Sequence, residues 1–202
     1  MVDYFSISAE GNADIEYGDY GTIQSNAKLG RKYVNVKDLG TANGPKEGET
    51  VWIRGRVNSV RAKGNSCFVV IRAGSFYTVQ ALHFKDKENA DLSKSMIKYI
   101  GNIQLESIVD ICGVVASANV KSCSQDNVEL QIRKMFVLSR APTVLPFLYE
   151  DACRSQEEID ASQSEERPFA SVSQDARLNS RWLDLRTPAN AAIMKIRGGI
   201  AG

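Results

Sequence analysis

Residues 51–84 read VWIRGRVNSVRAKGNSCFVVIRAGSFYTVQALHF, and this stretch decides the fold. It is rich in β-branched and aromatic residues, which favour strands. Turn signals at 64–65 (Gly-Asn) and 73–75 (Ala-Gly-Ser) divide it into three runs, so it predicts three consecutive strands joined by tight turns. The alternation in the second run is unusual, because an aromatic residue, Phe68, shares a face with Arg72.

Two further strand-like runs follow, at 107–119 and 127–139. The segment between the third and fourth runs has apolar residues at helical spacing: Leu92, Met96, Ile97 and Ile100. It predicts a helix that stops near Gly101. An order of three strands, a helix and two strands is that of an all-β, five-stranded Greek-key barrel, the OB-fold, with a helix between strands three and four. A small Greek-key sandwich is the alternative.

The chain outside the barrel predicts an N-terminal extension and a C-terminal hinge and helix. We expect four segments: an extension at 1–45, the OB-fold domain at 46–145, a hinge or linker at 146–180 with at most one short helical piece, and the start of a truncated further domain at 181–202. Thr187 as N-cap and Pro188 in the first turn predict the start of the last helix.

Several classes of protein are excluded by composition. There is no run of about 18 apolar residues and no basic-then-apolar start, so we expect no membrane span and no secretory signal. None of the four cysteines lies in a CxxC pair and His83 is the only histidine, so we expect no metal site and assign His83 no role. Cys67 and Cys112 fall in apolar runs typical of core thiols. A cytoplasmic protein with reduced thiols is expected.

Basic residues are unevenly distributed. Although the formal net charge is only +1, residues 51–85 contain six Lys or Arg and no Asp or Glu. Acidic residues concentrate instead at the N-terminus and at 150–166. This asymmetry predicts a local polyanion site on an otherwise near-neutral chain. The alternative is an ordinary solvated face.

Period-2 alternation separates a core face of the barrel from an outer face. The outer face would carry Phe68, Gln80 and Glu129, with Arg61 at its rim because a bulge near the first turn would alter its facing. An exposed ring can stack on an unpaired base, and amide and carboxylate groups can read base edges. The candidates for phosphate contacts are Arg54, Arg56 and Lys63. The alternatives are that Phe68 caps the barrel end or packs under a loop, and that the polar residues are merely solvated.

The runs WIRGRVNSVRAKGNSCFVVIR, YTVQAL, ESIVDICGVV and VELQIRKMFVLS resemble the N-terminal anticodon-binding OB-fold of the eukaryotic cytosolic aspartyl-tRNA synthetases, which are class II enzymes. SQDARLNSRWLDLRTPANAAIMKIRGGI is similar to the hinge of that family and to the helix that leads into its catalytic domain. The resemblance implies that Phe68 stacks on the central anticodon base, and that Arg61, Gln80 and Glu129 contact anticodon nucleotides. The implied partner is the anticodon stem-loop of tRNA(Asp).

The resemblance also implies what these 202 residues should not do. The class II motifs that bind ATP and aspartate would lie downstream of Gly202. We therefore expect these residues to bind tRNA, to include no catalytic residue and to bind no cofactor. The full-length ligase would use ATP and Mg. It would form a homodimer mainly through the catalytic domain, and membership of a multi-synthetase complex is a further expectation.

One feature of the family is missing. Many eukaryotic members carry a lysine-rich N-terminal helix that adds general tRNA affinity, whereas the first 21 residues here contain no Lys or Arg. Lys28, Arg31 and Lys32 would be a weak substitute. Two other functions stay open at this point: a general binder of single-stranded nucleic acid, and a protein-interaction module that uses the acidic tail and the linker.

Overall fold

The computed structural model describes residues 19–22 and 30–201. Most of the acidic N-terminal tail, and Lys28, lie outside the described residues. The chain divides into two compact units, Met1–Ala141 and Pro142–Gly202, and each is described by itself. This division differs from the four expected segments, which stay a prediction.

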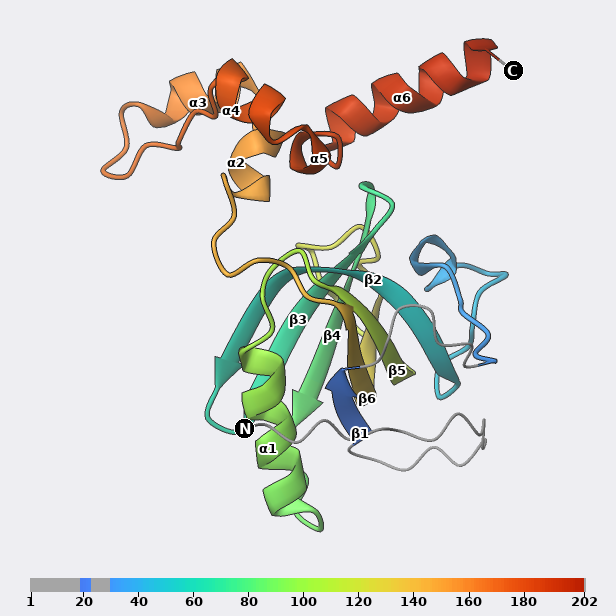
Figure 1. Cartoon of the computed structure of the whole chain (residues 1–202). Coiled ribbons are helices and arrows are strands. Elements are labelled where there is room, and N and C mark those ends of the chain that lie inside the picture. Colours follow the sequence, from blue (N-terminus) through green and yellow to red (C-terminus); the bar gives the residue numbers. More distant parts are fainter. Residues whose placement is uncertain (1–18, 23–29, 202) are drawn as a thin grey trace. The chain divides into compact units, whose positions relative to one another are not determined.

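The first unit is a β-barrel with one helix (Figure 1). Its elements are β1 (Asp19–Thr22), the 3-10 helix η1 (Val36–Asp38), β2 (Thr50–Lys63), β3 (Ser66–Ala73), β4 (Tyr77–Phe84), α1 (Ala90–Gly101), β5 (Ile108–Ser117) and β6 (Val128–Ser139). The strand order is β1-β6-β4-β3-β2-β5, and β5 also pairs with β6. That last pairing closes β2–β6 into a barrel, which confirms the five-stranded OB-fold and excludes the open sandwich.

The long strand β2 closes the barrel by changing partners. Its first half pairs with β5 and its second half with β3, and Arg56 is the residue that the two pairings share. Gly55 lies at this changeover. A Cβ atom at Gly55 would lie 2.5 Å from Cγ2 of Ile71 and 2.8 Å from the carbonyl oxygen of Arg72. Only a residue without a side chain lets the strands approach this closely.

The barrel core contains most of the residues that period 2 assigns to it, but not Tyr77, which belongs to the expected core face of β4 and is 37% exposed. Val69, Ile71, Val79, Ala81 and Leu130 are all completely buried. The core cluster draws on every strand from β2 to β6 and on α1. The outer face of these strands is therefore the surface that remains for a ligand.

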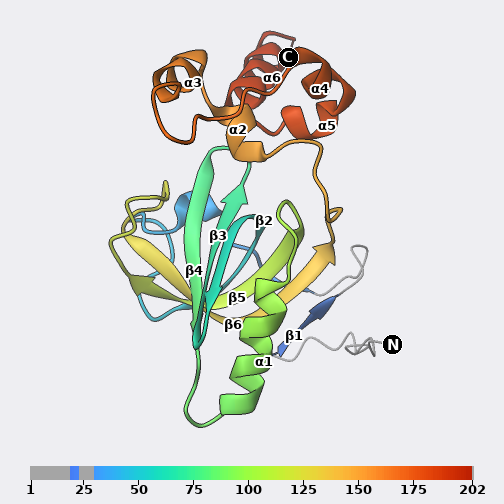
Figure 2. The same ribbon diagram turned by 90° about the vertical axis from the view of Figure 1, so that its left-hand side faces the viewer.

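Helix α1 lies beside the end of the barrel at which β4 stops (Figure 2). Its buried stripe is Ser93, Met96, Ile97 and Ile100. The expectation that Leu92 belongs to this stripe is wrong, because its side chain is 41% exposed. Ser93 takes the place on the buried face because its hydroxyl bonds to the buried ring of His83 and to the carbonyl oxygen of Phe84.

Part of the segment before residue 46 is built into the barrel unit. β1 adds a sixth strand, parallel to β6, and Tyr99 of α1 donates a 2.5 Å hydrogen bond to the carbonyl oxygen of Gly21. After it, Tyr33 forms a single bridge to Trp52, and η1 follows.

The second unit consists of short helices and one longer one: α2 (Tyr149–Cys153), α3 (Gln156–Ser162), α4 (Gln174–Asn179), α5 (Arg181–Asp184) and α6 (Pro188–Ala201). Residues 146–180 thus hold three helices rather than at most one. Capping explains two of them, because the hydroxyls of Ser155 and Ser173 accept hydrogen bonds from the amides of Glu158 and Ala176. The predicted start of the last helix at Pro188 is confirmed.

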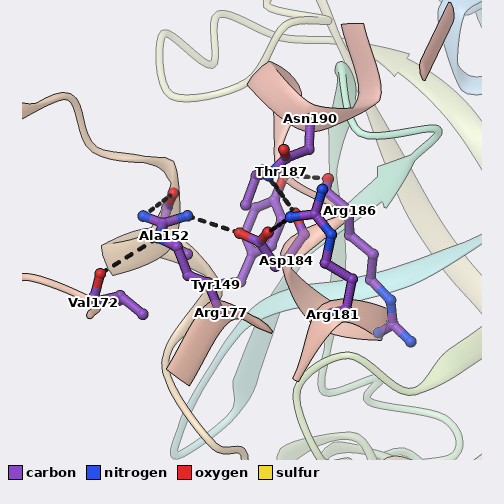
Figure 3. A network of polar contacts seen from close by, with 9 residues as sticks. All are labelled: Tyr149, Ala152, Val172, Arg177, Arg181, Asp184, Arg186, Thr187 and Asn190. Atoms are coloured by element: carbon purple, nitrogen blue, oxygen red, sulfur yellow. Dashed lines mark hydrogen bonds and ion pairs between the residues drawn. The ribbon is translucent and has the colours of Figure 1, made fainter. Parts of the chain in front are cut away.

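Asp184 joins the helices of the second unit (Figure 3). Its carboxylate is 1% exposed and accepts from Arg181 and, at 2.8 Å, from Arg177. Arg177 also donates to the carbonyl oxygen of Ala152 in α2, at 3.0 Å. The hydroxyl of Thr187 donates to the carbonyl oxygen of Asp184 at the start of α6. A buried carboxylate held by two guanidinium groups is therefore the polar centre of this unit.

In the described part of the chain no helix is long and apolar enough to cross a membrane.

Candidate nucleic-acid interface

The registers of the sheet align the predicted site residues in two neighbouring rows on the outer face. One row runs across four strands: Arg61, Phe68, Leu82 and Gln131. The next row contains Ser59, Val70, Gln80 and Glu129. Residues directly opposite each other on paired strands have Cβ atoms about 5 Å apart. The structure therefore brings Arg61, Phe68, Gln80 and Glu129 together on one surface.

A β-bulge in β2 determines which way Arg61 faces. Val57 pairs with Ile71, yet the next pair is Ser59 with Val70, so Asn58 is an extra residue. Strict alternation from the inward-facing Val57 would point Arg61 into the barrel. The bulge shifts the alternation by one, and Arg61 becomes the outward partner of Phe68.

Arg72 is the residue that holds this bulge. Its guanidinium donates to the side-chain oxygen of Asn58 at 2.6 Å and to the carboxylate of Glu106 at 2.6 Å. Both members of the ion pair are buried, since Arg72 is 4% exposed and Glu106 3% exposed. Arg72 lies on the same strand face as Phe68, and it is buried there because it pairs with Glu106. It is not one of the outer arginines that period 2 suggested.

Phe68 is half-buried rather than fully exposed, and it contacts a second aromatic ring. Phe84, two residues beyond its cross-strand partner Leu82, meets it edge-on with 5.9 Å between ring centroids. Phe84 is 56% exposed, whereas Leu82, directly opposite Phe68, is only 5% exposed. We call this pair, Phe68 and Phe84, the aromatic platform. Sequence analysis missed Phe84, although alternation along β4 already places it on the same face as Gln80.

Gln80 and Glu129 are directly opposite each other and hydrogen-bonded. The Nε2 atom of Gln80 donates to Oε2 of Glu129 at 3.3 Å. A carboxylate only accepts hydrogen bonds, so the amide must turn its NH2 group toward Glu129. The carbonyl oxygen of Gln80 is thereby directed away from the carboxylate. The pair offers a ligand an oriented amide beside an acceptor.

The three candidates for phosphate contacts lie in different surroundings. The guanidinium of Arg54 forms two hydrogen bonds, of 2.7 and 3.0 Å, to the buried carboxylate of Asp110. Arg56 donates to the carbonyl oxygen of Glu106 at 3.1 Å. Lys63 is exposed at the end of β2, beside the turn to β3. Of the three, Lys63 has the surroundings that suit a phosphate contact.

Asp110 organises a polar cluster at a distance from the aromatic platform. Arg31 also pairs with it, at 3.1 Å, and places its guanidinium 3.9 Å from the ring centroid of Trp52. The hydroxyl of Tyr33 donates to Asp110 at 2.7 Å. Burial, together with that hydrogen bond, raises the pKa of Tyr33, so its hydroxyl stays protonated and continues to donate. Arg31 therefore attaches the N-terminal segment to the barrel.

The remaining titratable groups of the barrel have structural surroundings. The ring of His83 is buried, with Nδ1 3.2 Å from the carbonyl oxygen of Ile132 and Nε2 3.1 Å from the hydroxyl of Ser93. Burial lowers its pKa. Burial also raises the pKa of the Cys67 thiol to about 11. Within residues 19–22 and 30–201, no group of three or more His, Cys, Asp or Glu side chains is placed to hold a metal ion.

Comparisons with known proteins agree with this geometry. Residues 51–138 match a family model described as the OB-fold nucleic acid binding domain. The chain is 43% identical over 195 residues to the cytoplasmic aspartate–tRNA ligase of Bos taurus, a match that covers 96% of this chain and 36% of the relative. It is 39% identical over 187 residues to the corresponding enzyme of Caenorhabditis elegans, covering 91% of this chain and 34% of the relative.

The chain is therefore similar to part of the cytoplasmic aspartate–tRNA ligases. It spans about a third of the length of these relatives. The aspartyl-tRNA synthetase of Entamoeba histolytica is similar in structure, with a TM-score of 0.79 and 30% identity, over 89% of this chain and 39% of that one. The asparaginyl-tRNA synthetase of Pyrococcus horikoshii has a TM-score of 0.53 and 20% identity, over 83% of this chain and 33% of that one, which shows a shared fold.

Proposed function

We propose that the barrel unit binds the anticodon loop of tRNA(Asp), and that the longer ligase to which this chain corresponds attaches aspartate to that tRNA. The observation that carries the proposal is the alignment of Arg61, Phe68, Gln80 and Glu129 in adjacent rows on the outer face of an OB barrel. That combination supplies a stacking surface, a cation and a fixed hydrogen-bonding pair. Single-stranded loops are the part of an RNA whose base edges such a surface can reach.

Each residue has a distinct role in this proposal. Phe68, supported by Phe84, stacks on one unpaired base, and Arg61 beside it holds an adjoining phosphate. Gln80 presents its carbonyl oxygen, oriented by Glu129, and Glu129 accepts hydrogen bonds only. The two polar residues thus select bases that offer donor groups. Arg54 contributes indirectly, through Asp110, by holding the barrel and the N-terminal segment together.

The catalytic step belongs to the other two thirds of the relatives' length. The full ligase would use ATP and Mg there, act in the cytoplasm, and form a homodimer through that part. The residues described here contribute substrate selection.

The decisive experiment is a titration of the 202-residue chain with a fluorescent anticodon stem-loop of tRNA(Asp). Phe68→Ala should weaken binding by about 1–3 kcal/mol, which is roughly 5- to 150-fold, because it removes one stacked base. Phe169→Ala, at an exposed ring in the second unit, is the matched control and should bind as the wild type does. Unchanged binding by Phe68→Ala would exclude the stacking role.

Base selection needs a separate titration. Gln80→Ala and Glu129→Ala should reduce the preference for the natural anticodon over base-substituted loops while leaving the salt dependence unchanged. An equal loss of affinity for every loop sequence would show that the pair does not select bases.

A further inference from the structure

A hollow of about 520 Å³ lies between the β2–β3 turn and helix α1, outside the rows described above. Its lining comes from two segments: Ala62, Lys63 and Gly64 on one side, and Lys94, Ser95, Ile97, Lys98, Gly101 and Asn102 on the other. The helix approaches the strand closely here, since a Cβ atom at Gly101 would lie 3.0 Å from Cβ of Ala62. The hollow is therefore part of the packing of α1 on the barrel and not a gap beside a loose loop.

The charged residues that line this hollow are all basic. Three of its lining residues, Lys63, Lys94 and Lys98, are basic, and no lining residue is acidic. All three lysines are exposed, and none forms an ion pair with residues 19–22 or 30–201. Lys94 and Lys98 are one helical turn apart, so they extend from the same side of α1. Three ammonium groups around one concave surface attract a polyanion.

The hollow adjoins the aromatic platform. Lys63 pairs with Ser66 at the end of the β2–β3 hairpin, and Arg61 pairs with Phe68 two residues further along the same two strands. Two residues of a strand span about 7 Å. A nucleic-acid strand whose base lies on Phe68 therefore has its neighbouring phosphates within reach of Lys63, and beyond it of Lys94 and Lys98.

We infer that this hollow binds backbone phosphates of the RNA strand next to the base stacked on Phe68, with Lys94 and Lys98 of α1 as the new contacts. This inference rests on the proposed anticodon-loop binding and adds a second, sequence-independent part to the site. Its lining has no aromatic ring to stack on a base and no carboxylate to read one. Lysine binds phosphate as a flexible point charge, so these contacts position the strand and do not select bases.

The test measures how RNA affinity depends on salt. For a single strand, each neutralised phosphate contributes about 0.7 to the slope of log K against log salt concentration. Lys94→Gln/Lys98→Gln in the 202-residue chain should lower that slope by about 1.4 and weaken stem-loop binding roughly 25-fold at about 0.1 M salt. The loss should be equal for natural and base-substituted loops, and Lys94→Arg/Lys98→Arg should retain the wild-type slope.

The control variant removes the same number of positive charges at positions outside the hollow. Lys37 in η1 and Lys46 before the start of β2 are exposed and lie in segments that do not line the hollow. Lys37→Gln/Lys46→Gln should therefore leave the slope near that of the wild type. If both double variants lower the slope equally, net charge and not the hollow is responsible, and the inference fails.

Two further outcomes separate this inference from the function on which it rests. If the wild type binds the stem-loop and Phe68→Ala weakens it, but Lys94→Gln/Lys98→Gln binds as the wild type does, the hollow has no role and the anticodon-binding function stands. If the wild type does not bind the stem-loop at all, the proposed function itself fails. If inorganic phosphate binds the wild type at constant ionic strength and no longer binds Lys94→Gln/Lys98→Gln, while both bind the stem-loop equally, the hollow holds a free anion and the inference is overturned.

Discussion

Arg72 forms an ion pair with Glu106 and a hydrogen bond to Asn58, the extra residue of the bulge. Through the bulge it also affects the direction in which Arg61 points. Its hydrogen bonds to Asn58 and to Glu106 are both 2.6 Å long. A buried charge that loses its partner is much more costly than a pair that was never formed. The consequences of removing this one side chain are therefore measurable both in folding and in binding.

Arg72→Met should lower the free energy of unfolding by about 3–5 kcal/mol, because it leaves the carboxylate of Glu106 buried without its cation. Urea denaturation measures this loss. Arg72→Met/Glu106→Gln should recover part of it, since no uncompensated charge remains. A double variant no more stable than the single one would show that charge burial is not the cause.

The four cysteines should differ sharply in reactivity. Burial raises the pKa of Cys67 to about 11 and also raises the pKa values of Cys112 and Cys123, whereas Cys153 is exposed. Because the thiolate is the reactive form, an aromatic disulfide reagent at pH 8 should label one thiol per native chain. Cys153→Ser should abolish that rapid labelling, and unfolding should release the rest. Two fast thiols in the native wild type would contradict the buried placement.

Single residues of the site were predictable where alternation is regular and not where it is interrupted. Phe68, Gln80 and Glu129 lie on the predicted outer face because β3, β4 and the start of β6 follow period 2. Arg61 was placed only at the rim of that face, since nothing local in the sequence fixes the position of the bulge at Asn58. The partner of Arg72, Glu106, lies 34 positions away along the chain. Such a pairing is a property of the fold.

Strand β2 depends on Gly55 at the point where it leaves β5 for β3. Gly55→Ala should destabilise the barrel by about 1–3 kcal/mol, because the added methyl group would overlap Ile71 and the backbone of Arg72. Gly198→Ala is the matched control, since nothing lies within 4 Å of its Cβ position in α6. The urea transition of the barrel should shift for the first variant only. Equal stability of Gly55→Ala and the wild type would show that the strands have room to separate.

Helix α1, β4 and β6 meet at His83, and this contact should make stability depend on pH. Burial lowers the pKa of His83 below the value of about 6.5 that it has in an unfolded chain. Below pH 6.5 the unfolded chain then binds more protons than the folded one, so stability is complete above about pH 6.5 and falls as pH decreases toward the lowered pKa. Urea denaturation between pH 7.5 and 5 measures this fall.

His83→Gln is the control for that pH dependence. His83 is the only histidine of the chain, so the variant should show a flatter profile between pH 7.5 and 5. An unchanged profile would assign the effect to carboxylates. Sequence analysis gave His83 no role, because a lone histidine has no visible partner until the fold brings Ser93 and Ile132 to its ring.

The two compact units differ in how much core they contain. The core cluster lies entirely between Val36 and Val137, whereas the buried apolar residues beyond Pro142 are Ala152, Ile159 and Leu183. A chain that ends at Ala141 should therefore keep the urea midpoint of the barrel and bind the anticodon stem-loop with the affinity of the 202-residue chain. A large loss of either would show that the second unit contributes to the barrel or to its ligand.

The barrel was predictable as a whole, and the second unit was not. Five strand-like runs around one helical run specify a closed Greek key, because few topologies accept that order. Residues 146–180 lack such periodicity. Their short helices rest on caps such as Ser155 and on the buried carboxylate of Asp184, which joins segments that look unrelated in the sequence.

The bulge at Asn58 has a consequence for how this strand can evolve. Because Asn58 is the one extra residue, deleting it would remove the bulge and the hydrogen bond that Arg72 donates to it. Val57, Ser59, Val60 and Arg61 would then alternate regularly against the same partners on β3, with Arg61 still on the outer face. The outward direction of Arg61 is therefore compatible with two lengths of this stretch, one with the bulge and one without it.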